Sequence, residues 1–474
     1  MGRLDAEDRA LRRLLLLVAA LPALGHVGSP DVYLEGAAGP YRLLVTVRPP
    51  VVIPGVAEVE IRALGDGVQR VSITPTPMTG PGAQFAPTPD FAKQDAGDRR
   101  FFAGSLWMMS SGSWQVRVRA EGAQGAGELR VPVPNASVRT MGMSVALGWT
   151  LFGLMAMLVL GLVAMVGAAV REAQLDAGAA VPASAVRKGR LAMLVAAVFM
   201  GLSLWGGNQW WTAEANGYDS YRYKALKLNA AFAGGRLDLR LEHTGWFQSE
   251  TFDDLVPDHG KIMHLFVARL PELDQVWHLH PAMPGPGQFQ HALPAMPAGR
   301  YQLYADIVHK SGFPETLVTE ISLPGVAGSV TAEDDSMGLA GAPLHDGYRM
   351  VFETAGEKLV AKRAANLRFR LEGPTGLAPT DQQLYLGMPG HAIVLRKDRG
   401  VFAHLHPTGT VPMAALELAA QGLDPHALHR MHEGRVPNVV AFPYGFPSAG
   451  SYRLFVQMKR AGQVETGVFD VEVK

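Results

Sequence analysis

Outside two long apolar segments, hydrophobic and polar residues alternate with a period of two along much of the chain. The stretch VAEVEIRAL (56–64) places its alanine, valine and isoleucine residues on one face and its charged residues on the other. The stretch SWQVRVRAE (113–121) alternates in the same way. Because successive side chains of a strand point to opposite faces, this pattern predicts half-buried antiparallel β-strands.

Turns rich in proline and glycine, such as residues 74–90, separate these short strands. Short strands with frequent turn signals and little amphipathic helix are typical of β-sandwiches. We therefore predict a mainly β protein with three Ig-like or cupredoxin-like antiparallel β-sandwich domains plus two transmembrane α-helices. The predicted sandwiches cover residues 26–139, 214–325 and 340–474, with a linker at 322–343.

Two apolar segments interrupt the period-two pattern. No residue from Met141 to Val170 is charged, and Leu191 to Ala213 is apolar with tryptophans near its end. A helix needs about 20 such residues to cross a bilayer. We predict transmembrane helices at 140–170 and 191–213. The short connection, 171–190, carries four basic residues and is predicted to be cytoplasmic.

The N-terminus carries arginines followed by an apolar run, residues 14–24, that is too short to span a bilayer. Small residues follow this run, so residues 1–25 are predicted to be a signal peptide, with an uncleaved anchor as the alternative. Export and the basic loop agree in orientation. The expected location is the bacterial inner membrane, as a multi-pass protein whose large domains lie on the periplasmic side.

Charge and cysteine content exclude several classes of function. The chain has 43 lysine and arginine residues against 43 aspartate and glutamate residues, so its net charge gives no reason to expect a nucleic-acid partner. It contains no cysteine. Disulfides, thiolate nucleophiles and cysteine-ligated metals are therefore excluded, and any metal must be held by histidine, methionine or carboxylate.

One histidine pattern occurs twice, as VWHLHP at 276–281 and FAHLHP at 402–407. Each copy is preceded by a strand that begins with a histidine and is followed by a similar strand, RYQLYADI or SYRLFVQM. Fourteen residues separate His264 from His278, and thirteen separate His391 from His404. This shared order and spacing predicts an internal duplication.

In each copy the two histidines share one face of the strand. In the first copy Trp277 and Leu279 point to the other, core-facing side. Two imidazoles on one face can chelate one ion if neighbouring strands add further ligands. Copper is favoured over zinc as the cofactor because Met283 and Met296 lie near the predicted site. The candidate metal ligands are His264, His278, His280, His391, His404 and His406, together with His259, His291 and His309.

Alternatives remain for these histidines. Each one alone is equally well interpreted as a structural residue whose ring ties a loop to a carbonyl. A second group, His426, His429 and His432, has the spacing of one helical stripe. If the signal peptide is cut after Gly25, His26 becomes a terminal residue that can grip copper through its amine and its ring.

The runs GMPGHAIVLRKDRGVFAHLHP (387–407) and FPSAGSYRLFVQMKRAGQVETGVFDVEV (446–473) resemble bacterial secreted YtkA-like and FixH-type β-sandwich modules with an HxHP motif. That resemblance implies a secreted β-sandwich associated with copper and respiratory-oxidase functions. It also implies that His391, His404 and His406, with their counterparts in the first copy, are the ligands. The N-terminal domain resembles CopC-like copper-binding sandwiches but lacks a second histidine.

Together these patterns predict a membrane-anchored exported protein that handles metal, copper before zinc, in delivery, buffering or resistance. The alternative is a β-sandwich scaffold without metal that assists assembly of a respiratory membrane complex. The expected partners are the lipid bilayer and a copper or respiratory membrane protein. We do not expect an enzyme. A zinc hydrolase could use Asp254 or Asp258 to activate water, but the sequence offers no second catalytic group to accompany that site.

Overall fold

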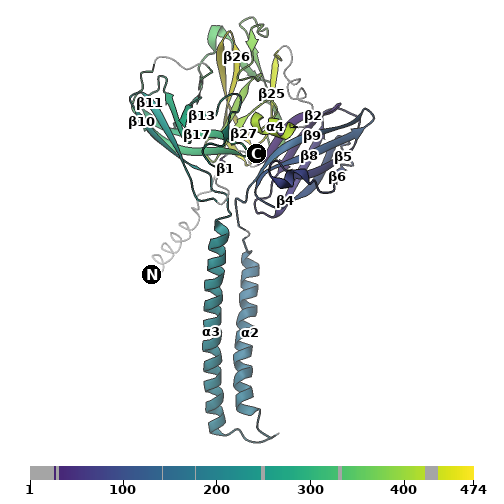
Figure 1. Ribbon diagram of the computed structural model, residues 1–474, viewed down its shortest axis with the longest axis vertical. Coiled ribbons are helices and arrows are strands. Elements are labelled where there is room, and N and C mark those ends of the chain that lie inside the picture. The colour runs from purple at the N-terminus through teal and green to yellow at the C-terminus, as the bar shows by residue number, and fades with distance from the viewer. Residues whose placement is uncertain are drawn as a thin grey trace, which may run out of the picture. The chain divides into compact units, whose positions relative to one another are not determined.

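The computed structural model describes residues 26–27, 31–140, 142–176, 178–246, 251–328, 334–421 and 436–474. The predicted signal peptide, 1–25, lies outside these residues. The protein is mainly β, with several sheets and two long apolar helices (Figure 1). Its chain forms two compact units. The β-rich unit contains the chain up to Ala136 with 224–244 and 248–474, and the helical unit contains 137–223 with 245–247.

Eight strands of the N-terminal region form one sheet in the order β2-β3-β4-β7-β6-β5-β8-β9. Its core is lined by the predicted apolar faces, including Val59 and Ile61 of β4 and Val116 and Val118 of β8. The period-two prediction is confirmed for both stretches. The elements are β2 (Val32–Ala38), β3 (Tyr41–Arg48), β4 (Gly55–Ala63), β5 (Val68–Pro77), the 3-10 helix η1 (Pro81–Gln84), β6 (Asp90–Gln94), β7 (Phe101–Met108), β8 (Gly112–Gly122) and β9 (Gly125–Asn135).

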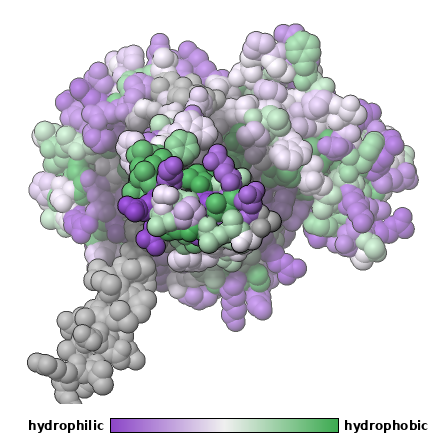
Figure 2. Space-filling view, turned by 90° about the horizontal axis from the view of Figure 1, so that it is seen from below, coloured by the Kyte–Doolittle hydropathy of each residue, from purple (hydrophilic) through white to green (hydrophobic). Residues whose placement is uncertain are grey.

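The helical unit consists of α2 (Val145–Glu172) and α3 (Ala183–Asp219), both long and apolar enough to cross a membrane. Helix α3 begins before and ends after the transmembrane helix predicted at 191–213. The two helices pack closely where Gly167 meets Gly189: a Cβ at Gly167 would lie 2.4 Å from the Met193 side chain. Figure 2 views this unit end-on and shows both apolar and hydrophilic residues at the end that carries the α2–α3 turn.

The first histidine module, defined as β10–β19, has two sheets. A four-stranded sheet, β10-β11-β16-β15, and a six-stranded sheet, β12-β17-β13-β14-β19 with β18 on β17, enclose one core that contains Trp277 and Leu279. The strands are β10 (Lys227–Ala233), β11 (Arg236–Glu242), β12 (Leu255–Val256), β13 (His264–Leu270), β14 (Gln275–Leu279), β15 (Ala282–Gly285), β16 (Gln288–Ala292), β17 (Gly299–His309), β18 (Pro314–Leu323) and β19 (Ser336–Leu339).

The second histidine module, defined as β20–β27 with α4, repeats this plan. A three-stranded sheet, β20-β21-β25, and a sheet with the order β22-β26-β23-β24, with β27 on β26, enclose a second core. The elements are η2 (His345–Gly347), β20 (Arg349–Phe352), β21 (Ala364–Glu372), β22 (Gln382–Gln383), β23 (His391–Arg396), β24 (Val401–Leu405), α4 (Met413–Ala420), β25 (Val439–Gly445), β26 (Gly450–Arg460) and β27 (Gln463–Val473).

The larger sheets of the two modules have the same strand order, which agrees with an internal duplication. The turn before the first histidine strand is repeated as well. A β-bridge joins Asp258 to Lys261 in one copy and Tyr385 to Met388 in the other. The next residue has a positive φ in both copies, 51° at His259 and 51° at Leu386. Asp258 and Tyr385 therefore occupy equivalent positions.

The outer neighbour of each HLHP strand differs between the modules. In the first module it is β19, which lies inside the predicted linker 322–343 and pairs with β14. In the second it is β1 (His26–Val27), which pairs in parallel with β24. The linker prediction was therefore wrong at Ser336–Leu339, and His26 joins the second module's sheet rather than the N-terminal one.

The two six-stranded sheets pack against each other through an apolar cluster shared by both modules. Phe266 and Tyr304 of the first module meet Phe402 and Phe455 of the second within this cluster. The rings of Tyr304 and Phe402 stack with centroids 4.2 Å apart. The faces opposite the two module cores are thus buried against each other, and the histidine strands lie on these faces.

Candidate metal centre

Strand register brings the histidines of each module together. Phe266 pairs with His278 across β13 and β14, so the register two residues further along places His264 opposite His280. Ile393 pairs with His404 across β23 and β24, so two residues further along His391 lies opposite His406. Because Trp277 and Leu279 fill the module core, the histidines point out of it, as the alternation predicted.

Seven histidines from both modules form one contiguous buried cluster between the two modules. The ring centroids of His264 and His404, which come from different modules, lie 5.3 Å apart, and those of His278 and His404 lie 5.7 Å apart. The histidine cluster, as we call it, consists of His259, His264, His278, His280, His391, His404 and His406.

Within the cluster, two groups have the geometry of a metal site. The first trio is His264, His278 and His280, all from the first module, and the second trio is His259, His391 and His406, from both modules. In each trio one ring nitrogen per residue lies within 4.8 Å of the others. Three imidazoles at this spacing are the usual protein contribution to a four-coordinate ion.

Burial keeps these rings in the neutral state that binds metal. The pKa values of His264, His278, His391 and His404 are lowered well below 6.5, first by burial and then by neighbouring histidines. Burial also lowers the pKa of His406, to about 3. A neutral imidazole has one N–H and one bare nitrogen, and its hydrogen bonds determine which is which.

Hydrogen bonds leave two bare nitrogens facing each other in the first trio. His264 Nε2 lies 3.1 Å from the Asp258 carbonyl oxygen, which only accepts, so His264 Nδ1 is bare. His278 Nδ1 lies 3.1 Å from Gln457 Oε1 and 3.2 Å from the Tyr385 hydroxyl, which itself donates to the Asp334 carbonyl. His278 Nε2 is therefore bare as well. With the Gln457 amide oriented so that its Nε2 donates to Ser336, these two bare nitrogens face each other 3.0 Å apart.

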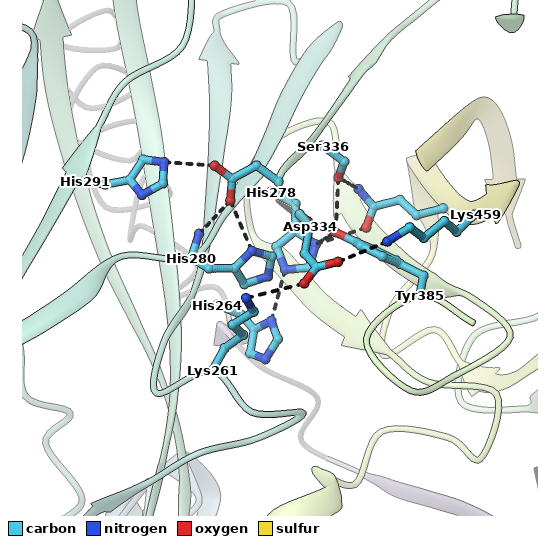
Figure 3. Close-up of polar contacts among 11 residues, drawn as sticks. Lys261, His264, His278, His280, His291, Asp334, Ser336, Tyr385 and Lys459 are labelled. Carbon is cyan, nitrogen blue, oxygen red and sulfur yellow. Dashed lines mark hydrogen bonds and ion pairs between the residues drawn. The ribbon is translucent and has the colours of Figure 1, made fainter. Parts of the chain in front are cut away.

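The third member of the trio is held by a carboxylate (Figure 3). His280 Nδ1 and its backbone N–H both lie 3.1 Å from one oxygen of Asp335, and His291 Nε2 lies 3.0 Å from the other. Burial acts to raise the pKa of Asp335, but the hydrogen bonds from His280 and His291 outweigh it and lower that pKa. Within the part of the chain that the structure describes, Nε2 of His280 is left buried with no hydrogen-bond partner. A carboxylate behind a histidine is the usual outer support of a metal ligand.

The second trio is arranged similarly across the module boundary. His406 Nδ1 lies 3.2 Å from the Val411 carbonyl oxygen, which leaves Nε2 bare, 3.3 Å from His259 Nε2. Neither ring nitrogen of His391 has a hydrogen-bond partner among the described residues, although the residue is fully buried. Asp258 lies beside His259 and accepts from the backbone N–H of Ala414, at the start of α4.

His404 lies between the trios. Its Nδ1 is 3.5 Å from a carboxylate oxygen of Asp306, and its Nε2 is buried with no hydrogen-bond partner among the residues that the structure describes. Burial raises the pKa of Asp306 to about 7, while a hydrogen bond donated by Thr316 opposes the rise.

Each module supports the histidines of the other. Asp306 is the strand partner of His264, and Gln457 is the strand partner of His391, so these two residues are equivalent. Gln457 of the second module contacts His278 of the first, whereas Asp306 of the first contacts His404 of the second. The cluster is therefore a single centre built by both copies.

Not every predicted ligand belongs to the cluster. His309 places its ring nitrogens 2.9 Å from Asp254 and 3.3 Å from Glu315, so both are already used. His291 contacts the centre through Asp335. Met283 and Met296 pack with the core of the first module, on the opposite side of the sheet. The segment with His426, His429 and His432 lies outside the described residues.

Sequence reasoning missed the residues that support the ligands, namely Asp306, Asp335, Tyr385 and Gln457. A signal existed for Gln457: in SYRLFVQMKR the residues Tyr452, Leu454, Val456 and Met458 fill the module core, which leaves a glutamine on a second buried face beside Phe455. A polar residue on a buried apolar face requires a polar partner.

The cluster fits a bound ion in two respects. Two nitrogens about 2.0–2.1 Å from one tetrahedral ion are about 3.3 Å apart, close to the 3.0 and 3.3 Å found in the trios. Each buried nitrogen without a partner costs about 1–3 kcal/mol. Among the described residues, His280 and His404 each carry one such nitrogen and His391 carries two. Two bare nitrogens that face each other repel through their lone pairs. A cation between them would remove both this repulsion and the free-energy cost of the missing hydrogen bonds.

A protein family described as a domain of unknown function (DUF8832) matches residues 343–474, which contain β20–β27 and three members of the cluster. No curated protein matches the chain.

Solved structures with some likeness include a 1.5-MDa bacterial ice-binding adhesin, 7% identical, with 89% of both chains covered and a TM-score of 0.15. An ICAM-5 D1–D4 ectodomain fragment is 8% identical, with 91% of this chain and 77% of that one covered and a TM-score of 0.16. Invasin, a bacterial integrin-binding protein, is 9% identical, with 94% and 60% covered and a TM-score of 0.14. At such TM-scores these likenesses carry no argument about this chain.

Proposed function

We propose that this protein is a membrane-anchored metal-binding protein that holds a transition-metal ion in the histidine cluster. The observation that carries the proposal is the pair of bare nitrogens in the first trio, His264 Nδ1 and His278 Nε2, at 3.0 Å. Neutral rings in this arrangement repel each other, and a cation between them is the simplest source of attraction. His280, oriented by Asp335, supplies a third donor.

Copper is the proposed ion, with zinc second. The donors are all imidazoles, which suit copper and zinc rather than calcium or magnesium. At nitrogen sites Cu²⁺ binds more tightly than Zn²⁺. The two methionines that favoured Cu⁺ in the sequence lie in the module core, so the donor set supports Cu²⁺ better than Cu⁺.

The proposed setting is the periplasmic side of a bacterial inner membrane. Helices α2 and α3 would cross the membrane, with the basic residues near their connection on the cytoplasmic side. The three cores of the β-rich unit support three sandwich domains of the Ig-like or cupredoxin-like kind. A YtkA-like or FixH-type relationship would agree with copper delivery, buffering or resistance.

The test uses the full chain in detergent, produced in medium supplemented with copper or zinc, because the donor nitrogens are buried and require the ion during folding. Metal per chain is measured by mass spectrometry. We expect copper to be retained after dialysis, and to be lost when His278, His280, His404 and His406 are all changed to alanine. The matched control is His345→Ala, since the side chain of His345 is 62% exposed and outside the cluster. Retention in the quadruple variant would rule out the histidine cluster as the copper site, and absence of copper from the unmodified chain would favour the scaffold without metal.

A further inference from the structure

We propose that the histidine cluster is a two-ion centre, in which the first trio holds one ion within the first module and the second trio holds another across both modules. This inference rests on the proposed function and specifies how many ions are bound and by which residues. His404 lies between the two ions as a ligand that either one can reach.

Spacing separates the cluster into two sites. Inside the first trio the ring centroids of His278 and His280 are 4.5 Å apart, and the other two pairs are each 5.2 Å apart. Inside the second trio the three distances are 4.8, 5.2 and 5.2 Å. Between trios, His259 and His264 are 6.1 Å apart, and His278 and His391 are 6.4 Å apart.

Coordination number leads to the same division. A four-coordinate ion uses at most four imidazoles, so one ion leaves at least three of the seven rings without a role. Two ions use all seven if each trio binds one ion and His404 completes one of the two sites. His404 is suited to this because its Nε2 is buried and has no hydrogen-bond partner in the described part of the chain. Its ring is 5.3 Å from His264 and 4.6 Å from His406.

The two sites differ in what they require of the fold. All ligands of the first trio come from β13, β14 and the residue after β14, so this site needs only the first module. The second trio takes His259 from the first module and His391 and His406 from the second. An ion there would join the two modules, whereas an ion in the first trio would not.

The test counts copper ions and their magnetic coupling in the full chain, purified in detergent after production with copper. We expect two copper ions per chain. Two Cu²⁺ ions in adjacent sites interact, so electron paramagnetic resonance should show a half-field transition and a weakened main signal. His280→Gln and His259→Gln should each retain one ion and show the full, uncoupled signal of a single Cu²⁺.

One ion per chain in the unmodified protein would overturn the inference but leave the proposed function intact. No ion at all would overturn both. Loss of all copper from both single variants, each with a thermal unfolding midpoint like that of the unmodified chain, would also indicate one shared site. The ion count and half-field transition of the unmodified chain do not depend on whether the variants fold.

Discussion

The two histidine modules share a strand order and a set of histidines, but they differ in the residues around those histidines. At equivalent positions the first module has Asp258 and Asp306, whereas the second has Tyr385 and Gln457. The first module thus places Asp306 beside His404 of the second module and Asp258 beside its own His259, and its His278 receives a neutral amide and a phenol from the second module. The copies have become complementary halves of one centre rather than two independent sites.

Because of this difference, the carboxylates near the two trios are arranged differently. The second trio lies beside Asp258, and His404 beside Asp306, both buried acids whose pKa values are raised by burial. The first trio has neutral support at His278 and one carboxylate, Asp335, behind His280. A divalent ion in either trio would therefore be balanced by a different arrangement of acids, which makes matched substitutions in the two modules informative.

The largest effect is expected from exchanging equivalent histidines, His278 and His404, for glutamine. His278→Gln removes a member of the first trio, so copper should fall from two ions per chain to one. His404→Gln removes a ligand that lies outside both trios and completes only one of the two sites, so both ions should remain, with affinity at one site lowered about 10-fold. Copper analysis and competition with a chelator measure the two quantities. If both variants lose the same amount of copper, the proposed asymmetry is wrong.

The interface between the modules offers the second comparison. Phe402 stacks on Tyr304 and is fully buried, so Phe402→Ala should cost about 3–5 kcal/mol in stability. If it loosens the contact between modules, the second trio should lose its ion while the first trio retains its own. Thermal unfolding and copper content check this. Phe85→Ala is the control, because Phe85 is 75% exposed. Loss of the first ion alone would contradict the assignment.

Removing the carboxylate that orients a ligand should have a third, smaller effect, on copper affinity. Asp335→Asn keeps the shape but removes the charge that orients His280 and His291, so copper affinity of the first trio should fall about 10–100-fold. Its neighbour is a matched control: Asp334 pairs with Lys261 and Lys459 instead of a histidine (Figure 3). Asp334→Asn should leave the affinity unchanged. Equal effects from the two variants would mean that general negative charge, rather than the contact to His280, supports the site.

Much of the local structure was predictable from sequence because it depends on short-range periodicity. Alternation placed Trp277 in the core and His278 on the other face, and the long apolar segments became α2 and α3. The repeated histidines identified six members of the cluster, and the seventh, His259, was predicted only as an additional candidate. What lies opposite each face was not predictable, because contacts such as His278 to Gln457 join residues 179 positions apart. Very short strands such as β1 and β19 carry too few residues for a period to be recognised.

The smallest expected effect concerns a buried cation that each module places between two carboxylates. In the first module it is His309, between Asp254 and Glu315. In the second it is Arg460, next to Asp381 and Glu465. Strand pairing makes Glu315 and Glu465 equivalent, since they face Ile307 and Met458 at matching positions of β17 and β26.

Because the buried cation is a histidine in one module and an arginine in the other, its contribution to stability should depend on pH in the first module and not in the second. Burial acts to lower the pKa of His309, but hydrogen bonds to Glu315 and Asp254 outweigh it and raise that pKa above its ordinary value. The stabilisation by protonated His309 is then fully present below about pH 6.5 and is lost as the pH rises through the raised, folded-state pKa. Arg460 stays charged throughout, because burial, which lowers its pKa, is outweighed by Asp381 and Asp346.

The measurement is the thermal unfolding midpoint of the unmodified chain, His309→Gln and Arg460→Gln in a pH series from about 5.5 to about 8.5. The gap between the unmodified chain and His309→Gln should be widest at the acidic end and should narrow as the pH rises. The gap for Arg460→Gln should stay constant over the same range. Because every variant keeps the histidine cluster, effects of pH on metal binding are common to all three proteins and cancel in the gaps. A gap for His309→Gln that widens with pH would mean that His309 is held neutral, and that the two modules differ here in charge as well as in residue.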